Sequence, residues 1–208
     1  MKNIVVTGIG TDVGKTIVSA ILTRALNADY WKPIQSGECK DSETLKKLTP
    51  QTFCHQEGIL LKAPRSPHHA AYLEGIAIDA DKILLPQTSS TLIIEGCGGL
   101  LVPLNEKMLT VDLFSKWECT WVVVSRHYVG SINHTLLTLE EMKKRKLNVL
   151  GIIFNGDSCS QTEEAILTFS QYPCIGRLQQ EKQWSAKQID NYANQWKNQK
   201  AFQNAMQK

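Results

Sequence analysis

A chain of 208 residues has room for one ordinary domain and enough length to bury a substantial core. Its hydrophobic content of 42% and charged content of 21% are typical of a soluble globular protein, and no apolar run approaches the roughly 18 residues of a membrane span. The net charge of +3 comes with scattered lysines rather than a basic stripe, which argues against nucleic acid as the main partner.

Short apolar runs alternate with segments of helical periodicity along the chain. The apolar runs predict strands at residues 4–6, 30–31, 91–94, 121–124 and 150–154. Apolar residues at helical spacing predict helices over 15–27 and roughly 131–146. Because the predicted strands are apolar on both faces and are joined by helices, we expect a mostly parallel β-sheet with helices on both faces.

Two other segments are less regular. Residues 34–90 are richer in Pro, Ser, Gln and His, and we expect loops and short helices attached to the same domain. Residues 179–208 are rich in Gln, Lys and Asn, and their few apolar side chains predict a C-terminal helix packed by one narrow face. The sequence therefore predicts a single α/β domain over residues 1–208 with a C-terminal helical tail.

A glycine-rich segment follows the first predicted strand. It ends in the Gly-Lys-Thr of a phosphate-binding loop, but no glycine stands at the usual distance before Gly14. Backbone N–H groups of such a turn, followed by a helix N-terminus, form a site for phosphate oxygens. Lys15 would reach the β- and γ-phosphates, and the Thr16 hydroxyl would bind Mg²⁺.

Polar side chains also follow the other predicted strands. Glu95 ends an apolar run and precedes a glycine cluster, where an acid that holds a metal ion is expected. Lys32 follows the second strand and could neutralise charge on a transferring phosphoryl group. Ser125 and Asn155 follow two later strands. Because ligands bind at the carboxyl ends of parallel strands, we expect one shared site.

The cysteines and histidines show no metal-ligand pattern. The six cysteines include no C-x-x-C pair, and the N-terminus has no secretory signal, so we expect reduced thiols in a cytoplasmic protein. The five histidines also lack metal spacing, and we expect structural or substrate-lining roles for His68 and His134.

Five motifs stand in order along the chain. They are GIGTDVGKT at 8–16, KPIQSG at 32–37, SPHHAA at 66–71, IEGCGG at 94–99 and GSINHTLLT at 130–138. Together they resemble the motifs of the dethiobiotin synthetase family. In the first motif Gly8 stands six positions before Gly14, as in that family, whereas the two glycines of the standard phosphate loop are five positions apart.

The resemblance implies a P-loop NTPase-like α/β fold, a homodimer and an ATP-dependent ligase of biotin biosynthesis. The family's substrates are 7,8-diaminononanoate, CO₂ and ATP, with Mg²⁺ as the metal. One amine captures CO₂ as a carbamate, ATP phosphorylates the carbamate, and the second amine closes the ureido ring to give dethiobiotin, ADP and phosphate. An unactivated carbamate is a poor acyl donor, so phosphorylation supplies the leaving group.

The resemblance also implies roles for individual residues. The catalytic residues would be Lys15, Lys32 and Thr11. Mg²⁺ would be held by Thr16, Glu43 and Glu95. ATP would contact Asp12, Val13, Gly14, Lys15, Thr16, Ile17, Glu95, Gly96, Cys97, Gly98 and Asn155. The diamine would contact Asp12, Ser36, Ser66, Pro67, Gly130, Ile132 and Asn133, the last three from across a dimer interface.

The chain departs from the family pattern near the expected site for the nucleotide base. Asn155 matches the family's adenine-reading asparagine, but Gly156 stands where an aspartate is often found. The segment 176–178 only loosely resembles the one that helps to hold the base. The sequence therefore leaves nucleotide selectivity open.

Other classes of protein share parts of this pattern. A regulatory or partitioning ATPase of the deviant P-loop kind carries a signature lysine at the position of Gly10. A small-molecule kinase would show the regular loop spacing and an arginine-rich lid, and arginine is sparse in this chain. A nucleotide-dependent amidase or cofactor ligase usually carries an added glutaminase domain. We therefore favour dethiobiotin synthetase, with a regulatory ATPase or another P-loop ligase or kinase as alternatives.

Overall fold

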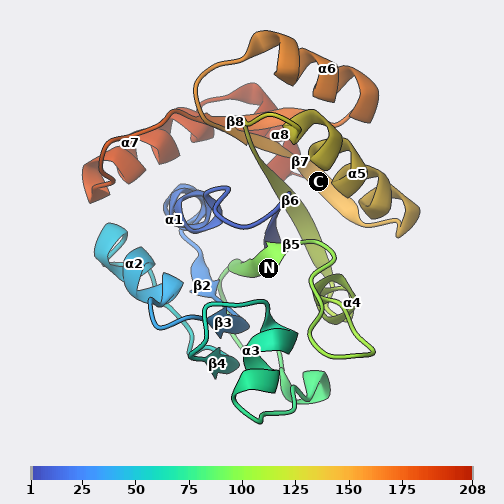
Figure 1. Ribbon diagram of the computed structural model, residues 1–208. Coiled ribbons are helices and arrows are strands. Elements are labelled where there is room, and N and C mark those ends of the chain that lie inside the picture. Colours follow the sequence, from blue (N-terminus) through green and yellow to red (C-terminus); the bar gives the residue numbers. More distant parts are fainter. Residues whose placement is uncertain (1, 208) are drawn as a thin grey trace.

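The computed structural model describes residues 2–207. Six parallel strands form a central sheet in the order β2-β5-β1-β6-β7-β8 (Figure 1). They are β1 Asn3–Gly8, β2 Asp29–Trp31, β5 Leu92–Gly99, β6 Cys119–Arg126, β7 Asn148–Asn155 and β8 Cys174–Leu178. A separate pair of parallel strands consists of β3 Ile34–Ser36 and β4 Ile59–Leu61.

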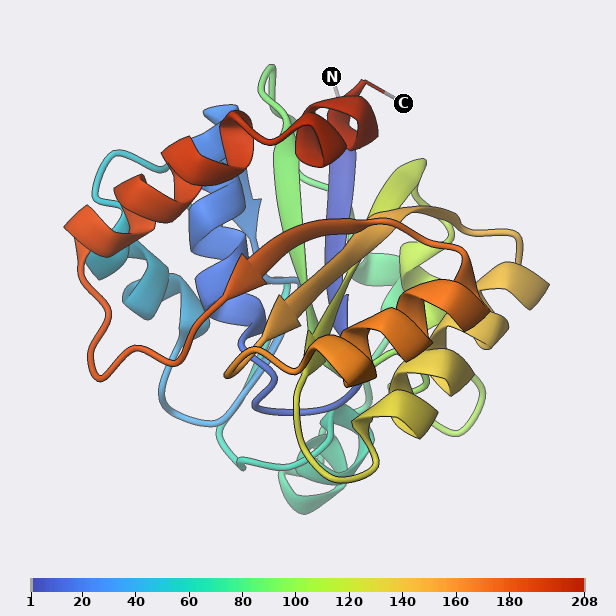
Figure 2. The ribbon, with the colours of Figure 1, turned by 90° about the horizontal axis from the view of Figure 1, so that it is seen from above.

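Helices cover both faces of the central sheet. They are α1 Lys15–Leu26, α2 Asp41–Leu48, α3 Pro67–Leu73, α4 Thr110–Phe114, α5 Ser131–Lys144, α6 Ser160–Ser170, α7 Ala186–Lys197 and α8 Lys200–Met206, with a 3₁₀ turn at Ala80–Lys82. One face carries α1, α2 and α7, and the opposite face carries α4, α5 and α6 (Figure 2). The predicted α/β architecture is therefore confirmed.

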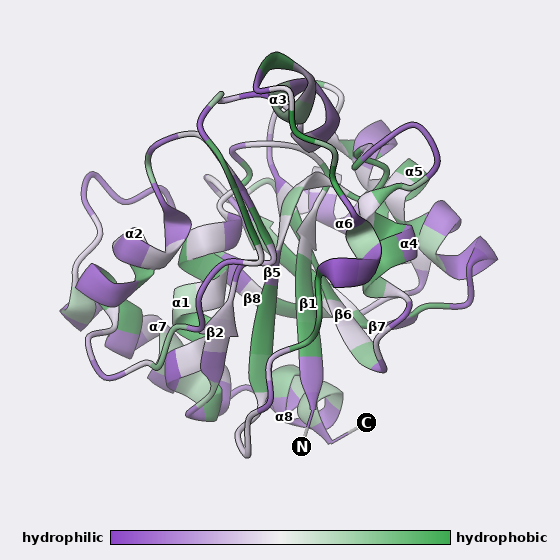
Figure 3. Cartoon of the chain, turned by 90° about the horizontal axis from the view of Figure 1, so that it is seen from below, coloured by the Kyte–Doolittle hydropathy of each residue, from purple (hydrophilic) through white to green (hydrophobic). Residues whose placement is uncertain are grey.

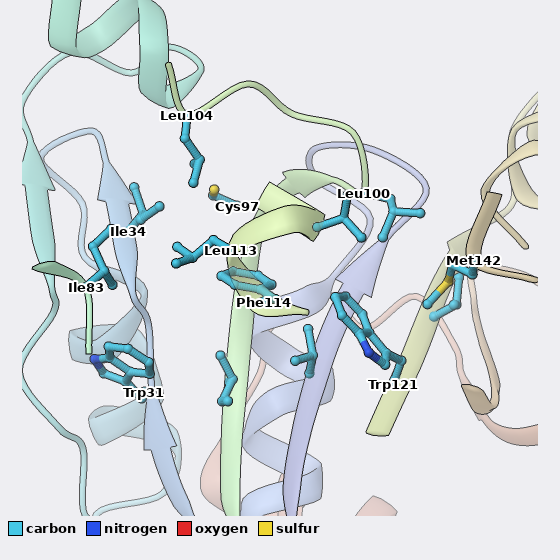
Figure 4. Packing of buried hydrophobic residues seen from close by; sticks show 14 of the residues in the cluster. Trp31, Ile34, Ile83, Cys97, Leu100, Leu104, Leu113, Phe114, Trp121 and Met142 are labelled. Carbon is cyan, nitrogen blue, oxygen red and sulfur yellow. The ribbon is translucent and has the colours of Figure 1, made fainter. Parts of the chain in front are cut away.

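The sheet separates two hydrophobic cores. Its central strands β1 and β5 are largely apolar (Figure 3). Successive strand side chains point to opposite faces, so Val5 joins one core while Ile4 and Val6 join the other. In the core under α4, Phe114 lies between Trp31 and Trp121 (Figure 4). Burying side chains of this size stabilises the fold by about 1.5–3 kcal/mol each.

All five predicted strands and both predicted helices are present. The helix predicted over 15–27 is α1, and the helix predicted over 131–146 is α5. Three of the strands extend further than the apolar runs suggest, because Glu95, Ser125 and Asn155 still belong to the ladder. These polar side chains thus belong to the strands that position them.

The C-terminal region differs from its prediction. Two helices, α7 and α8, replace the single expected helix, and the chain turns between them at Asn198–Gln199. Trp196 of α7 is fully buried over Gly176 of β8, where an added Cβ would lie 2.7 Å from the indole. Strand β8 was not predicted, because it has only five residues and exposes Arg177 next to its last residue.

The two ends of the described chain lie side by side, and Lys2 Nζ donates to the Met206 carbonyl at 2.7 Å. The carboxyl ends of the parallel strands lie at the opposite edge of the sheet, beside α3 (Figure 3). Within residues 2–207, no helix has both the length and the apolar composition needed to cross a bilayer. The strand-end edge is where the predicted polar residues meet.

Candidate active site

A cavity of about 690 Å³ opens at the carboxyl ends of β1, β2 and β5. It brings together most of the residues predicted from the sequence: Thr11, Asp12, Gly14, Lys15, Thr16, Ile17, Lys32, Ser36, Ser66, Pro67, Glu95, Cys97 and Gly98. Val13 and Gly96 are buried behind this wall rather than lining it. Segments far apart in the sequence thus form one site.

The loop between β1 and α1 has two residues in the left-handed backbone region. These are Asp12 with φ 55° and Gly14 with φ 97°. A Cβ at Gly14 would lie 2.4 Å from Asn155 Nδ2, so only glycine fits there. We call residues 9–14 the phosphate loop, because alternating backbone handedness followed by a helix N-terminus forms an anion-binding turn.

The Lys15 ammonium is nearly enclosed and donates to the Gly10 carbonyl at 2.9 Å. Burial lowers the pKa of Lys15 below its ordinary value, and the nearby Lys32 lowers it further, against the opposing effect of Glu95. The side chain is therefore held within the loop that it is expected to serve.

Acidic and hydroxyl groups converge beside this lysine. Thr16 Oγ1 lies 3.0 Å from Asp41 Oδ1 and 2.9 Å from Glu95 Oε1. Lys32 Nζ lies 3.0 Å from Glu95 Oε1 and pairs with Asp41 Oδ2. The Tyr30 hydroxyl donates to Glu95 Oε2 at 2.9 Å. We call Thr16, Lys32, Asp41 and Glu95 the charged cluster.

The carboxylates of the charged cluster raise the pKa of Lys32 within the cluster and of Tyr30 beside it. Burial alone would lower the pKa of Lys32, but Glu95 and Asp41 outweigh burial, and the net pKa is raised. Burial, followed by the negative charge of Glu95, raises the pKa of Tyr30 well above its ordinary value. Tyr30 therefore acts as a hydrogen-bond donor that orients the Glu95 carboxylate.

Asp41 takes the place that was predicted for Glu43. Both residues lie on α2, but a helix turns by about 100° per residue, so side chains two positions apart point about 200° apart. Asp41 faces the charged cluster, and Glu43 is exposed outside the cavity. The signal that could have identified Asp41 is an acid at the start of a helix six residues after Gln35.

Gln35 was also missed, and it shapes the segment that carries Asp41. Its buried side chain donates to the carbonyls of Ser36 and Cys39, at 3.0 and 3.2 Å, and accepts from the Asp41 amide at 3.1 Å. The Ser36 hydroxyl is buried, with no hydrogen-bond partner among the described residues. A polar atom of this kind is suited to bind a ligand in the adjoining cavity.

The oxygen atoms of the charged cluster fit a divalent cation. Mg²⁺ in phosphate sites is typically bound through one or two carboxylates together with phosphate oxygens and water. Asp41 and Glu95 each present a carboxylate oxygen within 3.0 Å of the Thr16 hydroxyl oxygen. Residues 2–207 contain no group of three or more His, Cys, Asp or Glu side chains that could hold a metal ion. The site proposed here therefore combines two carboxylates with the Thr16 hydroxyl.

A second cavity of about 360 Å³ adjoins the phosphate loop on its far side. It shares Asp12, Gly14 and Ile17 with the first cavity and is completed by Arg126, Asn155, Leu178, Gln179, Gln180, Glu181 and Trp184. Asn155 Nδ2 donates to the Val13 carbonyl at 2.8 Å, which leaves Oδ1 as an acceptor. Together the two cavities can hold an elongated ligand that crosses the loop.

The three residues predicted to bind from α5 are not brought to either cavity. Gly130, Ile132 and Asn133 lie exposed at the start of that helix. His134 follows them and its Nδ1 lies 2.8 Å from the Tyr128 hydroxyl, while His68 stands in the first turn of α3. Within one chain, the start of α5 is therefore a separate surface.

Comparison with solved structures gives the fold class. A ParA family ATPase from Chlorobium tepidum matches with a TM-score of 0.57 at 13% identity, covering 93% of this chain and 98% of that one. The septum site-determining protein MinD from Pyrococcus horikoshii matches with a TM-score of 0.54 at 15% identity, covering 98% and 92%. The predicted P-loop NTPase-like fold is confirmed, and at these identities the likeness concerns the fold alone.

Comparison of sequences gives the family. A family model described as an AAA domain matches residues 2–188. An ATP-dependent dethiobiotin synthetase from Chlamydia pneumoniae is 49% identical over 200 residues, covering 95% of this chain and 90% of that protein. Another from Christiangramia forsetii is 44% identical, covering 94% and 96%. The chain belongs to the ATP-dependent dethiobiotin synthetase family.

Proposed function

We propose that the protein is a dethiobiotin synthetase, which joins CO₂ to the two amines of 7,8-diaminononanoate at the expense of ATP. The observation that carries this proposal is that the first cavity is lined by the phosphate loop and also by polar residues outside that loop, such as Ser36 and Ser66. A regulatory ATPase would need only the nucleotide side. Two groups of this cavity could bind a second substrate. They are the Asp12 carboxylate and the buried Ser36 hydroxyl, which has no hydrogen-bond partner within residues 2–207.

The reaction proceeds in three steps. The first amine attacks CO₂ and loses a proton, which gives a carbamate. A carbamate oxygen then attacks the γ-phosphorus of ATP and releases ADP. The second amine attacks the carbonyl carbon and loses a proton, the carbon–oxygen bond to the phosphoryl group breaks, and phosphate leaves with its bridging oxygen as the ureido ring closes.

The chain's residues position these groups and neutralise charge. Lys15 and Lys32 would stabilise the transferring phosphoryl group, with the Thr11 hydroxyl close to the phosphates. The raised pKa of Lys32 keeps its ammonium charged for this role, since the adjacent carboxylates outweigh the effect of burial. In a low-dielectric site such fixed charges stabilise developing charge more strongly than water does.

Mg²⁺ would be held by Thr16, Asp41 and Glu95, whose oxygens meet in the charged cluster. When bound, the ion would neutralise charge on the phosphate oxygens. Asp41 replaces Glu43 in this proposal because only Asp41 faces the cavity. Tyr30 orients Glu95 through its hydroxyl.

The nucleotide would lie across the phosphate loop, with its phosphates in the first cavity and its base in the second. Of the residues assigned to ATP, Ile17 lines both cavities, and Cys97 and Gly98 of β5 line the first cavity, with Gly96 buried behind them. The Asn155 carbonyl oxygen is free to accept from the exocyclic amine of adenine, while its amide nitrogen is bound to Val13. This arrangement supports ATP over a guanine nucleotide.

The diamine would occupy the other end of the first cavity, where Ser66 and Pro67 stand at the start of α3. Its distal carboxylate would meet Gly130, Ile132 and Asn133 of a second copy of the chain. Apolar side chains near the start of α5 are exposed and support a homodimer: Leu101, Tyr128, Val129, Ile132 and Leu137. Val129 is fully exposed in the single chain.

Two further inferences concern the whole chain. All six cysteines are free, which supports a reducing compartment such as the cytoplasm. Residues 1–208 act as one domain in our proposal, because α7 and α8 bury Ile189, Trp196 and Phe202 in the same core as α1.

An omission assay tests the function. Purified protein receives Mg-ATP, bicarbonate and 7,8-diaminononanoate, and phosphate and dethiobiotin are measured with each component left out in turn. We expect both products only when all components are present. Phosphate release that ignores the diamine would instead indicate a regulatory ATPase, and no turnover in the complete mixture would overturn the proposal.

A further inference from the structure

Two consecutive carbonyls of the phosphate loop are held by side chains from neighbouring strand ends. Arg126 Nη1 donates to the Asp12 carbonyl at 2.9 Å, and Asn155 Nδ2 donates to the Val13 carbonyl at 2.8 Å. Arg126 and Asn155 are direct partners in the β6–β7 ladder. We call this pair the strand-end clamp.

The strand-end clamp fixes the direction of the loop's amide groups. In a trans peptide the carbonyl and the next N–H point to opposite sides, and the chain has no cis peptide in its described part. The bond from Arg126 to the Asp12 carbonyl therefore turns the Val13 N–H away from the clamp. The bond from Asn155 to the Val13 carbonyl does the same for the Gly14 N–H.

These two amides have no protein acceptor among residues 2–207. Buried or partly buried backbone donors are normally paired, so two free neighbouring donors indicate a place for an external acceptor. Their flanking residues, Asp12 and Gly14, line both cavities. An oxyanion bound at the loop would satisfy both donors.

Arg126 differs from the paired arginines of the chain. Arg24, Arg145 and Arg177 each bond a carboxylate. In the described part of the chain, Arg126 has no carboxylate within 4.0 Å, and its only hydrogen bond goes to the Asp12 carbonyl. A guanidinium has five N–H donors, so four remain available at the wall of the second cavity.

We propose that Arg126 is a positioning residue for the nucleotide. It holds the Asp12 carbonyl so that the Val13 amide meets a phosphate oxygen, and it sets an uncompensated positive charge where the nucleotide crosses from one cavity to the other. The proposal rests on the proposed function only in taking the ligand to be a nucleotide polyphosphate.

Binding of Mg-ADP by calorimetry tests the proposal without the other substrates. Arg126→Met keeps the length of the side chain but removes its donors, and we expect the dissociation constant to rise about tenfold, as for loss of one charge-assisted contact. Arg126→Lys keeps the charge with poorer geometry and should recover part of the loss. Arg24→Met, which removes an ion pair between α1 and α7, is the matched control and should bind as the wild type does.

A residue-specific readout separates positioning from a general loss of structure. In the wild type, addition of Mg-ADP should shift the amide proton resonances of both Val13 and Gly14 downfield. In Arg126→Met the Val13 shift should be lost or strongly reduced, while the Gly14 shift persists through Asn155. Asn155→Ala should give the reverse pattern.

The outcomes distinguish this proposal from the proposed function. Wild-type affinity for Mg-ADP in Arg126→Met, or an unchanged Val13 shift, would overturn the role of Arg126 even if the wild type makes dethiobiotin. Conversely, weakened Mg-ADP binding in Arg126→Met together with a wild type that ignores the diamine would retain the clamp and reject the synthetase. If Arg126→Lys binds Mg-ADP as tightly as the wild type does, Arg126 contributes only its charge, and its role in positioning the Asp12 carbonyl is rejected.

Discussion

At the scale of single residues, two lysines of one cavity lie in opposite electrostatic surroundings. Lys32 is bracketed by two carboxylates, which raise its pKa in spite of burial. Lys15 is lowered by burial, and Glu95 compensates only in part. Lys32 thus keeps its positive charge, whereas the charge of Lys15 would be fully compensated only by the phosphates that we propose it binds.

Lys32→Gln should lower kcat by about 10²–10³-fold, because one fixed charge that stabilises the transferring phosphoryl group is removed. Lys116→Gln removes another lysine, one that pairs with the exposed Asp81, and it should leave kcat unchanged. Steady-state kinetics check both variants, with thermal unfolding in parallel. An unchanged kcat in Lys32→Gln would remove this lysine from the catalytic set.

Lys15 predicts an alkaline limb in the pH profile. Its lowered pKa means that the free enzyme loses this ammonium below the ordinary lysine value of 10.5. Since phosphate binding needs the charged form, kcat/KM for ATP should fall as pH rises through that region, while Lys32 stays protonated. Stopped-time assays from about pH 7 to about pH 10 check this. If kcat/KM for ATP stays constant over this pH range, loss of the Lys15 proton does not limit ATP binding and the prediction is wrong.

At the scale of elements, the strands were easier to predict than the segments between them. Glu95 and Lys32 could be identified because each ends an apolar run, and parallel strands bring such ends to one edge. Asp41 and Gln35 could not, because their places depend on the hydrogen bonds that close the turn between β3 and α2. Arg126 was missed because its partner is a backbone carbonyl, which no side-chain motif records.

Helix α2 offers a matched pair of variants. Asp41→Asn should raise the Mg²⁺ concentration needed for half-maximal activity by about tenfold, because one of the two carboxylates proposed to hold the ion loses its charge. Glu43→Gln lies two residues further on the same helix, is exposed, and should need no more Mg²⁺ than the wild type. Metal titrations of both enzymes decide which acid serves the site, and a larger effect of Glu43→Gln would restore the sequence-based assignment.

At the scale of the whole molecule, one chain brings together the residues proposed for the nucleotide but not every residue expected for the diamine. The two cavities share the phosphate loop, whereas Gly130, Ile132 and Asn133 lie exposed on α5. The sequence could predict these residues from the motif alone. It could not place them, because the partner that we propose for these residues is a second copy of the chain.

Substitution at this surface should couple assembly to substrate binding. Val129→Glu together with Leu137→Glu puts charge on two exposed apolar positions, so the fold is retained while a dimer through this surface is lost. Sedimentation should show monomers, and KM for the diamine should rise more than KM for ATP. Phe169→Glu on α6 changes an equally exposed apolar residue away from this surface and is the control. A monomeric wild type with full activity would contradict the shared site.

In the proposed reaction, ATP transfers its γ-phosphoryl group to a carbamate oxygen rather than to water. The most direct test supplies ¹⁸O-labelled CO₂ with Mg-ATP and 7,8-diaminononanoate and follows the label in the released phosphate by mass spectrometry. Because the carbamate oxygen that attacks the γ-phosphorus leaves with the phosphate, we predict one ¹⁸O atom per phosphate and one dethiobiotin per ADP. Unlabelled phosphate, formed together with dethiobiotin, would show that the carbamate oxygen does not attack the γ-phosphorus.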